Sequence, residues 1–253
     1  MAIPQIHPTK ISDESFGGVT YHLEGELVPV LHIELSGVPV YFEHHVLLWK
    51  HPQVDIGLKT LAGAFKRVLS GMPIFMTQAK GPGHIAFSRD GAGQVLPIHL
   101  MRGQSLDVRE HQFLAATENI DFTFQRVRGF ANILFSQSGL FIDTFTAHAD
   151  GVVWLHGYGN VFEVTLGSGE QIDVEPGGWV YKDPSVSLET EMMSLSAGFF
   201  ASGGGQLVFN RFTGPGRVGI QSMYYHPPVG GGDAAETAAG VGLLGAVVRA
   251  ATR

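Results

Sequence analysis

The sequence has 253 residues, of which 44% are hydrophobic and only 15% are charged, and it contains 34 glycines but no cysteine. The lack of cysteine excludes disulfides, thiolate catalysis, zinc ribbons and iron–sulfur clusters, and the net charge of −7 argues against a broad nucleic-acid-binding surface. Few charges and many glycines are typical of short strands joined by tight turns, so we expect an all-β protein.

The first residues, MAIPQIHPTKISDESF, have no basic start followed by an apolar core. Their acidic side chains also argue against a transit peptide. We therefore expect a cytoplasmic protein, and features at the other end of the chain favour a peripheral position at the inner face of the membrane.

The sequence contains a repeat with a period of 66 residues. Similar segments surround Gly37, Gly103 and Gly169: VLHIELSGVPVYFEHHVLLWKHPQVDI, LPIHLMRGQSLDVREHQFLAATENIDF and FEVTLGSGEQIDVEPGGWVYKDPSVSL. Apolar residues alternate before and after a turn in each segment, which predicts two strands. We expect three tandem antiparallel β modules with pseudo-threefold symmetry, at about 15–70, 71–138 and 139–226, in a single domain over 1–229.

Residues 57–73, GLKTLAGAFKRVLSGMP, break this β pattern. Their apolar residues recur at helical spacing, which predicts one inserted helix near 57–71 that ends before Gly71 and Pro73. The other face of this helix carries Lys59, Lys66 and Arg67. We interpret these charges either as an ordinary solvated face or as a contact for anionic lipid or an acidic partner.

Residues 230–253 form a glycine-rich linker and an apolar tail. The uncharged run from Thr237 to Val248 is too short to span a bilayer. The tail is either disordered or docks on a membrane surface or a partner protein. Its candidate contact residues are Leu243, Leu244, Val247 and Val248.

The turn in GEQIDVEPGGWV, residues 169–180, resembles half of a cupin metal site but has Trp179 where a histidine ligand would stand. The repeat places His45, His111 and Gly177 in the same slot of this turn, so the module requires no particular ligand there. We expect no metal, no cofactor and no catalytic residue. A cupin-like ion remains an alternative if the modules face one another, held by His44, His45, Glu110 and His111.

Three segments carry a family resemblance: SGMPIFMTQAKGPGHIAF, GYGNVFEVTLGSGEQIDVEPGGWVYKDPSV and FNRFTGPGRVGIQS. From about residue 8 to about 226 the chain resembles the family named for altered inheritance of mitochondria protein 24. The resemblance implies three modules similar to the trp RNA-binding attenuation protein, a short relative of the double-stranded β-helix, and assembly into trimers. It also implies a link to the mitochondrial inner membrane in eukaryotic relatives, and it brings no defined catalytic residues.

These observations favour a non-enzymatic homotrimeric scaffold or binding platform. Its partners would be further copies of itself, together with a membrane surface or another protein held by the tail. The alternative is a cupin-like enzyme that binds a metal or a small molecule. A ring that binds RNA is weaker still, because the acidic balance gives no reason to expect nucleic acid as a partner.

Overall fold

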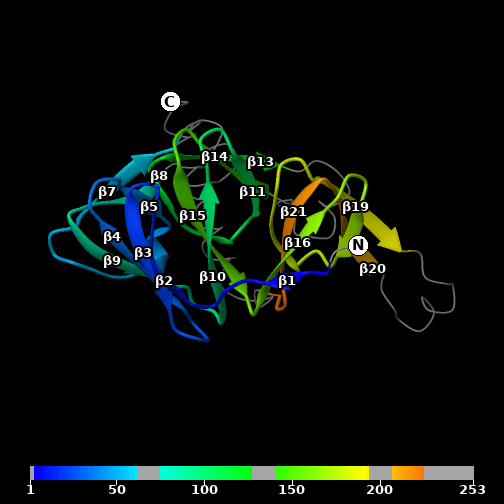
Figure 1. The fold of residues 1–253 in the computed structure, drawn as a ribbon, viewed down its shortest axis with the longest axis horizontal. Coiled ribbons are helices and arrows are strands. Elements are labelled where there is room, and N and C mark those ends of the chain that lie inside the picture. Colours follow the sequence, from blue (N-terminus) through cyan, green and yellow to red (C-terminus); the bar gives the residue numbers. More distant parts are fainter. Residues whose placement is uncertain (1–2, 62–74, 127–140, 194–206, 225–253) are drawn as a thin grey trace, which may run out of the picture.

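The computed structural model describes residues 3–61, 75–126, 141–193 and 207–224. This part of the chain is built from 21 strands, which confirms the all-β prediction, and its one helix is the three-residue 3-10 helix η1 (His44–Val46). Figure 1 shows the strands arranged along the long axis of the molecule. Within the described ranges, no helix has the length and apolar character needed to cross a bilayer.

The strands fall into an N-terminal group and three groups of six. The N-terminal group is β1 (Gln5–Ile6), β2 (Ile11–Phe16) and β3 (Val19–Glu24). The first module is β4 (Val30–Leu35), β5 (Val40–Phe42), β6 (Leu47–Lys50), β7 (Asp55–Thr60), β8 (Phe75–Lys80) and β9 (Gly83–Phe87). The second is β10 (Gly93–Leu100), β11 (Ser105–Arg109), β12 (Phe113–Thr117), β13 (Ile120–Arg126), β14 (Phe141–Ala147) and β15 (Gly151–Tyr158). The third is β16 (Val161–Leu166), β17 (Gln171–Val174), β18 (Trp179–Lys182), β19 (Ser187–Met193), β20 (Leu207–Thr213) and β21 (Gly216–Gln221).

One pairing scheme recurs in all three groups. The first and third strands of a module pair with the sixth, as β10 and β12 pair with β15, and the second and fourth pair with the fifth, as β11 and β13 pair with β14. The equivalent pairs are present in the first module and in the third. Every one of these strand pairs is antiparallel, so each module is an antiparallel β unit without parallel crossover connections.

Adjacent modules are joined through one strand pair each. The third strand of a module pairs with the second strand of the module before it: β12 with β5, and β18 with β11. Each module has two sets of three paired strands. The junctions join these sets into four sheets of seven, six, five and three strands, which also include β1, β2 and β3. In Figure 1 the first module lies at one end, the third at the other and the second between them. The chain between β1 and β2 runs along the molecule, so that β1 pairs with β16 of the third module.

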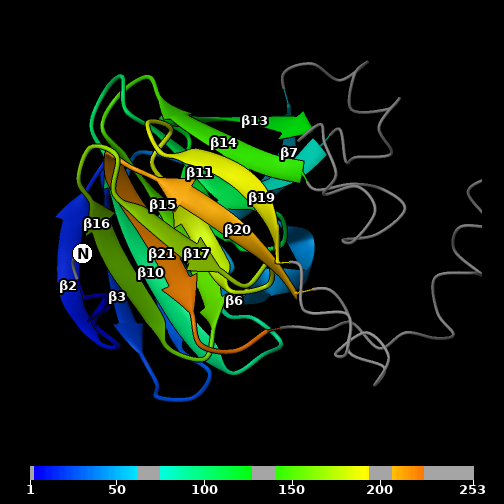
Figure 2. The same cartoon turned by 90° about the vertical axis from the view of Figure 1, so that its right-hand side faces the viewer.

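The core crosses the module boundaries, because one buried cluster contains Tyr41 of the first module, Phe113 of the second and Tyr181 of the third. Three clusters of buried apolar residues lie inside the sheets. Strands near the middle of the molecule are covered on both faces, and β15, GVVWLHGY, is buried along its whole length. Figure 2, viewed from the third-module end, shows the strands of successive modules one behind another. Burial on both faces explains why β15 has a continuous apolar run in place of an alternating pattern.

The predicted helix near 57–71 does not begin at residue 57. Residues 57–60 belong to β7, which pairs along its whole length with β8. Leu58, placed on the apolar helical face, is 70% exposed, whereas the side chain of Lys59 points inward. Pairing with β8 satisfies the backbone N–H and C=O groups of β7. Residues 57–60 therefore form a strand, although their apolar residues have helical spacing. Residues 62–74, which contain the rest of the expected helix, lie outside the described residues.

Candidate functional site

Strand β6 is an edge strand, although its equivalents in the other modules are not. It ends the five-stranded sheet, in the order β2-β3-β4-β9-β6. The equivalent strands β12 and β18 each have a neighbour on both sides. A free sheet edge offers unpaired backbone N–H and C=O groups to another strand.

The side chains of β6 are more exposed than those at the same positions of its equivalents. Leu48 is 54% exposed and Trp49 is 46% exposed. Sixty-six and 132 residues further on, the same positions of β12 and β18 are wholly buried, as Leu114, Ala115, Val180 and Tyr181. The β-bulge at this position is also the same in the three strands. The strand is therefore built like its buried equivalents but, among the described residues, lacks the second neighbouring strand that they have.

The complementary free edge is β17, in the third module. It ends the three-stranded sheet, whereas its equivalents β5 and β11 are paired on both sides. Asp173 on β17 is exposed, although the residues at its position in the other modules, Tyr41 and Asp107, are buried. Within the chain, Asp173 accepts two hydrogen bonds of 2.8 Å from Arg211. These hydrogen bonds hold the pKa of Asp173 below its ordinary value.

The junction between β11 and β18 shows how two such edges meet. Lys182 Nζ donates to Asp107 Oδ2 over 2.8 Å, and both side chains are buried. The hydroxyl of Thr144 donates to the other Asp107 oxygen, also over 2.8 Å. The charge of Asp107 is therefore matched by a cation and a further donor, which is the condition for keeping a buried ion pair. At the other junction, Tyr41 stands opposite Ala116 in the same register.

Lys59 does not face solvent as a free cation, contrary to the interpretation of its sequence position. Its Nζ lies 3.0 Å from Glu118 Oε1 and 4.1 Å from the centre of the Tyr41 ring, and its side chain is 14% exposed. It stabilises the junction between the first two modules and is not available to a lipid surface. The other predicted contact residues lie outside the described residues: Lys66, Arg67, Leu243, Leu244, Val247 and Val248.

The histidines of the repeated turn are not gathered into a metal group among the described side chains. His45 Nε2 lies 3.5 Å from Glu43, and His111 Nε2 lies 3.6 Å from Glu110, each within its own turn. His111 has φ = 69°, a left-handed conformation that closes the turn. In the third module the carboxylate of Glu175 accepts the N–H of Gly177 over 2.7 Å and has the same closing role.

A partly buried polar cluster holds the chain next to β1 on the third module. The Tyr181 hydroxyl contacts His7 Nε2 over 3.0 Å and donates to Glu163. Burial raises the pKa of Tyr181 well above its ordinary value, and burial lowers the pKa of His7. The tyrosine therefore stays protonated at neutral pH and acts as a hydrogen-bond donor rather than as a base.

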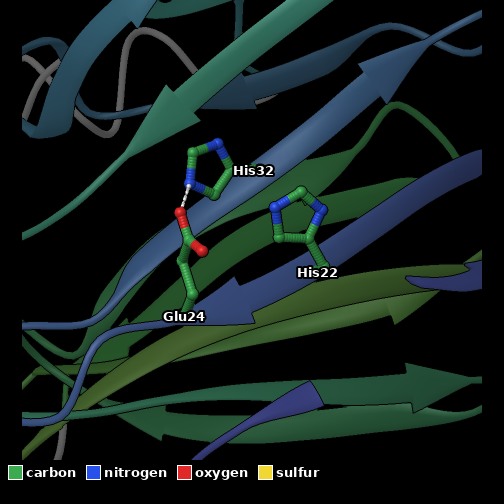
Figure 3. Close-up of side chains that lie close together, drawn as sticks. All are labelled: His22, Glu24 and His32. Carbon is green, nitrogen blue, oxygen red and sulfur yellow. Dashed lines mark ion pairs between the residues drawn. The ribbon is translucent and has the colours of Figure 1, made fainter. Parts of the chain in front are cut away.

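The histidine cluster that sequence reasoning missed lies on β3 and β4. His22, Glu24 and His32 lie close together on one face of this hairpin (Figure 3). His22 and Glu24 are two residues apart on β3, and His32 is directly opposite His22. The alternation in VTYHLE places His22 and Glu24 on the same face of a strand. The position of His32 follows only from the register of the hairpin.

Comparisons with known proteins agree with this architecture. The family described as Mitochondrial biogenesis AIM24 matches residues 21–223. No protein with a curated description matches the chain. A crystal structure of a Streptococcus pyogenes protein is similar in fold, with a TM-score of 0.63 and 21% identity over 81% of this chain and 94% of the other. These findings confirm the resemblance seen in the sequence, and the chain belongs to the Mitochondrial biogenesis AIM24 family.

Proposed function

We propose that the protein is a non-enzymatic homotrimeric scaffold in which β6 of one copy pairs with β17 of the next. The observation that carries the proposal is the exposure of Leu48 and Trp49 at positions that are buried in the other two modules. A second copy placed at β6 would cover them as β5 covers β12 and β11 covers β18. Pairing of the two free edges would also satisfy the backbone groups of both strands.

The internal junctions supply the register of this contact. Tyr41 pairs with Ala116 at one junction and Asp107 with Lys182 at the other, and the two pairs differ by 66 residues on each strand. Applied once more, this shift places Asp173 opposite Lys50 of the next copy. An aspartate and a lysine thus meet again in the positions of Asp107 and Lys182.

The contact is head-to-tail, because each copy contributes one β6 edge and one β17 edge. Head-to-tail contacts between identical chains either close into a ring or continue as a filament. Closure at three copies is supported by the family resemblance, which implies trimers, and gives a ring of nine modules. Such a ring removes every free edge of this type.

As a scaffold, the ring would hold partners rather than transform a substrate. Three copies of the tail on one ring would multiply a weak affinity for a membrane surface or a partner protein. This gives the protein a peripheral position at the cytoplasmic face of a membrane. Family membership supports a role in biogenesis at that coarse level.

Charge reversal at the two edges tests the assembly. The wild type should have three times the chain mass of 27.2 kDa in light scattering coupled to gel filtration. Lys50→Asp and Asp173→Lys should each give monomers, because each places like charges opposite one another. The double variant in one chain should restore the trimer. Asp121→Lys is the matched control, because it reverses an exposed acidic residue on β13, away from both edges.

Two results would reject this arrangement. A monomeric wild type would remove the assembly itself. Trimers that persist in both single variants would show that the copies meet through another surface, and the two free edges would then have no role in assembly.

A further inference from the structure

We propose that His22, Glu24 and His32 bind one divalent transition-metal ion of the zinc class. Each residue offers one ligand atom, and the three atoms lie within 4.8 Å of one another. Two imidazoles and a carboxylate are a ligand set used for zinc, with a further position left for water or another ligand. Calcium and magnesium prefer all-oxygen sites, so the two histidines select against them.

The strand pair holds these ligands in place. The His22 and His32 rings stack with their centres 4.5 Å apart and their planes at 15°. Trp49 packs against His32 from β6, with ring centres 5.5 Å apart. Both histidines lie on neighbouring strands of one sheet, which fixes their backbone positions, and rotation about the side-chain bonds would turn the stacked rings toward a shared ion. All three ligands come from one chain, so the ion would need no residue of a second copy, although Trp49 also lies on the edge proposed for assembly.

The Nε2 atom of His32 lacks the partner that a buried nitrogen needs. It lies 3.0 Å from Glu24 Oε1, but the contact does not have hydrogen-bond geometry, and the atom is buried without a hydrogen-bond partner. An unsatisfied buried polar atom destabilises the folded protein. A cation held jointly by Glu24 and His32 would satisfy both atoms (Figure 3).

Asp13 supplies the outer contact that metal-binding histidines commonly have. Its Oδ1 lies 3.1 Å from Nδ1 of His22. This contact fixes the ring and leaves Nε2 as the ligand nitrogen.

His22 and His32 line a hollow of about 220 Å³ that has room for an ion with bound water. The residues that line it are Asp13, Thr20, His22, His32, Ile33, Glu34 and His84. Asp13, Glu24 and Glu34 bring three carboxylates to this face, so a divalent cation would reduce their mutual repulsion. His84 is a further imidazole at the same hollow.

Cobalt(II) titration of the full-length protein, without an affinity tag, tests the site. Visible d–d absorption should report one Co²⁺ per chain, and Zn²⁺ should displace it. Asp13→Asn should weaken binding by about 10–100-fold, and His22→Gln or His32→Gln by more than that. His148→Gln is the matched control, because His148 is exposed beside Asp121 with a contact of 3.5 Å but belongs to no three-ligand group among the described residues.

Circular dichroism would verify that each variant is folded. His22 is the more exposed of the two histidines, so His22→Gln keeps the test informative if the partly buried His32 proves essential for folding. The proposal fails if the wild type binds no stoichiometric Co²⁺. It also fails if folded His22→Gln binds the ion as tightly as His148→Gln does.

Discussion

Lys182 and Asp107 form a buried ion pair, with 2.8 Å between Nζ and Oδ2, across the junction of the second and third modules. The two residues are 75 positions apart in the sequence and lie on adjacent paired strands, β18 and β11. The first junction has Tyr41 and Ala116 at the equivalent positions, so the fold does not need the ion pair at every junction.

Replacement of Lys182 by Met should destabilise the protein by about 3–5 kcal/mol, because Asp107 would remain buried without its cation. The double variant Asp107→Leu/Lys182→Met should lose much less, since no charge is then left unpaired. Urea unfolding at one fixed protein concentration measures both, and the two single variants complete a double-mutant cycle. A single-variant cost below about 1 kcal/mol would mean that water reaches Asp107.

The three glycines of the repeat should respond differently to alanine. Gly103 has φ = 85° and Gly169 has φ = 74°, whereas Gly37 is not in this left-handed region. An added Cβ meets no atom within 4 Å at any of the three, so backbone strain is the main difference. We expect Gly103→Ala and Gly169→Ala to cost about 1–2 kcal/mol and Gly37→Ala to be neutral or slightly stabilising. Equal melting temperatures in all three variants would contradict this.

Acid should destabilise the fold through His156. Burial, with a smaller effect of the Arg89 charge, lowers its pKa from 6.5 to about 4. Between these values the unfolded state binds more protons than the folded state, so the free energy of unfolding falls as the pH falls. The loss at pH 4 is on the order of 3 kcal/mol.

The variant His156→Gln isolates this effect. It lacks the titrating group, so its stability should fall less between pH 7 and pH 4 than that of the wild type. Chemical denaturation across this pH range gives both profiles. Parallel profiles would show that His156 does not carry the acid sensitivity, and His7, present in both proteins, would become the next candidate.

The tail should attach the protein to anionic membranes. Flotation with anionic liposomes should carry the full-length chain but not a version that ends at Val229, because the second lacks the apolar run with Leu243 and Leu244. Flotation with neutral liposomes, compared with anionic ones, measures how much the positively charged side chains, Lys66 and Arg67 among them, contribute to membrane binding. Equal behaviour of the two versions would eliminate the tail as an anchor.

The candidate sites show where sequence reasoning reached its limit. The alternation of VTYHLE places His22 and Glu24 on one face, but His32 joins them only through the register of β3 and β4. Similarly, Lys59 has the spacing of a helix surface, yet the side chain packs on Tyr41 because β7 pairs with β8. Helical and extended backbones compete for the same short apolar pattern, and long-range pairing decides between them.

The sequence by itself determined the all-β class and the 66-residue spacing, because strand alternation and turn glycines are local properties of the chain. It also carried the family resemblance through its repeated turns. The tertiary structure decided which edges are joined and which are left open, since strand pairing depends on segments far apart in the chain. Leu48 and Leu114 illustrate the difference: both are leucines at the same place in the repeat, but Leu114 is buried in a strand with two neighbours and Leu48 is exposed on an edge strand.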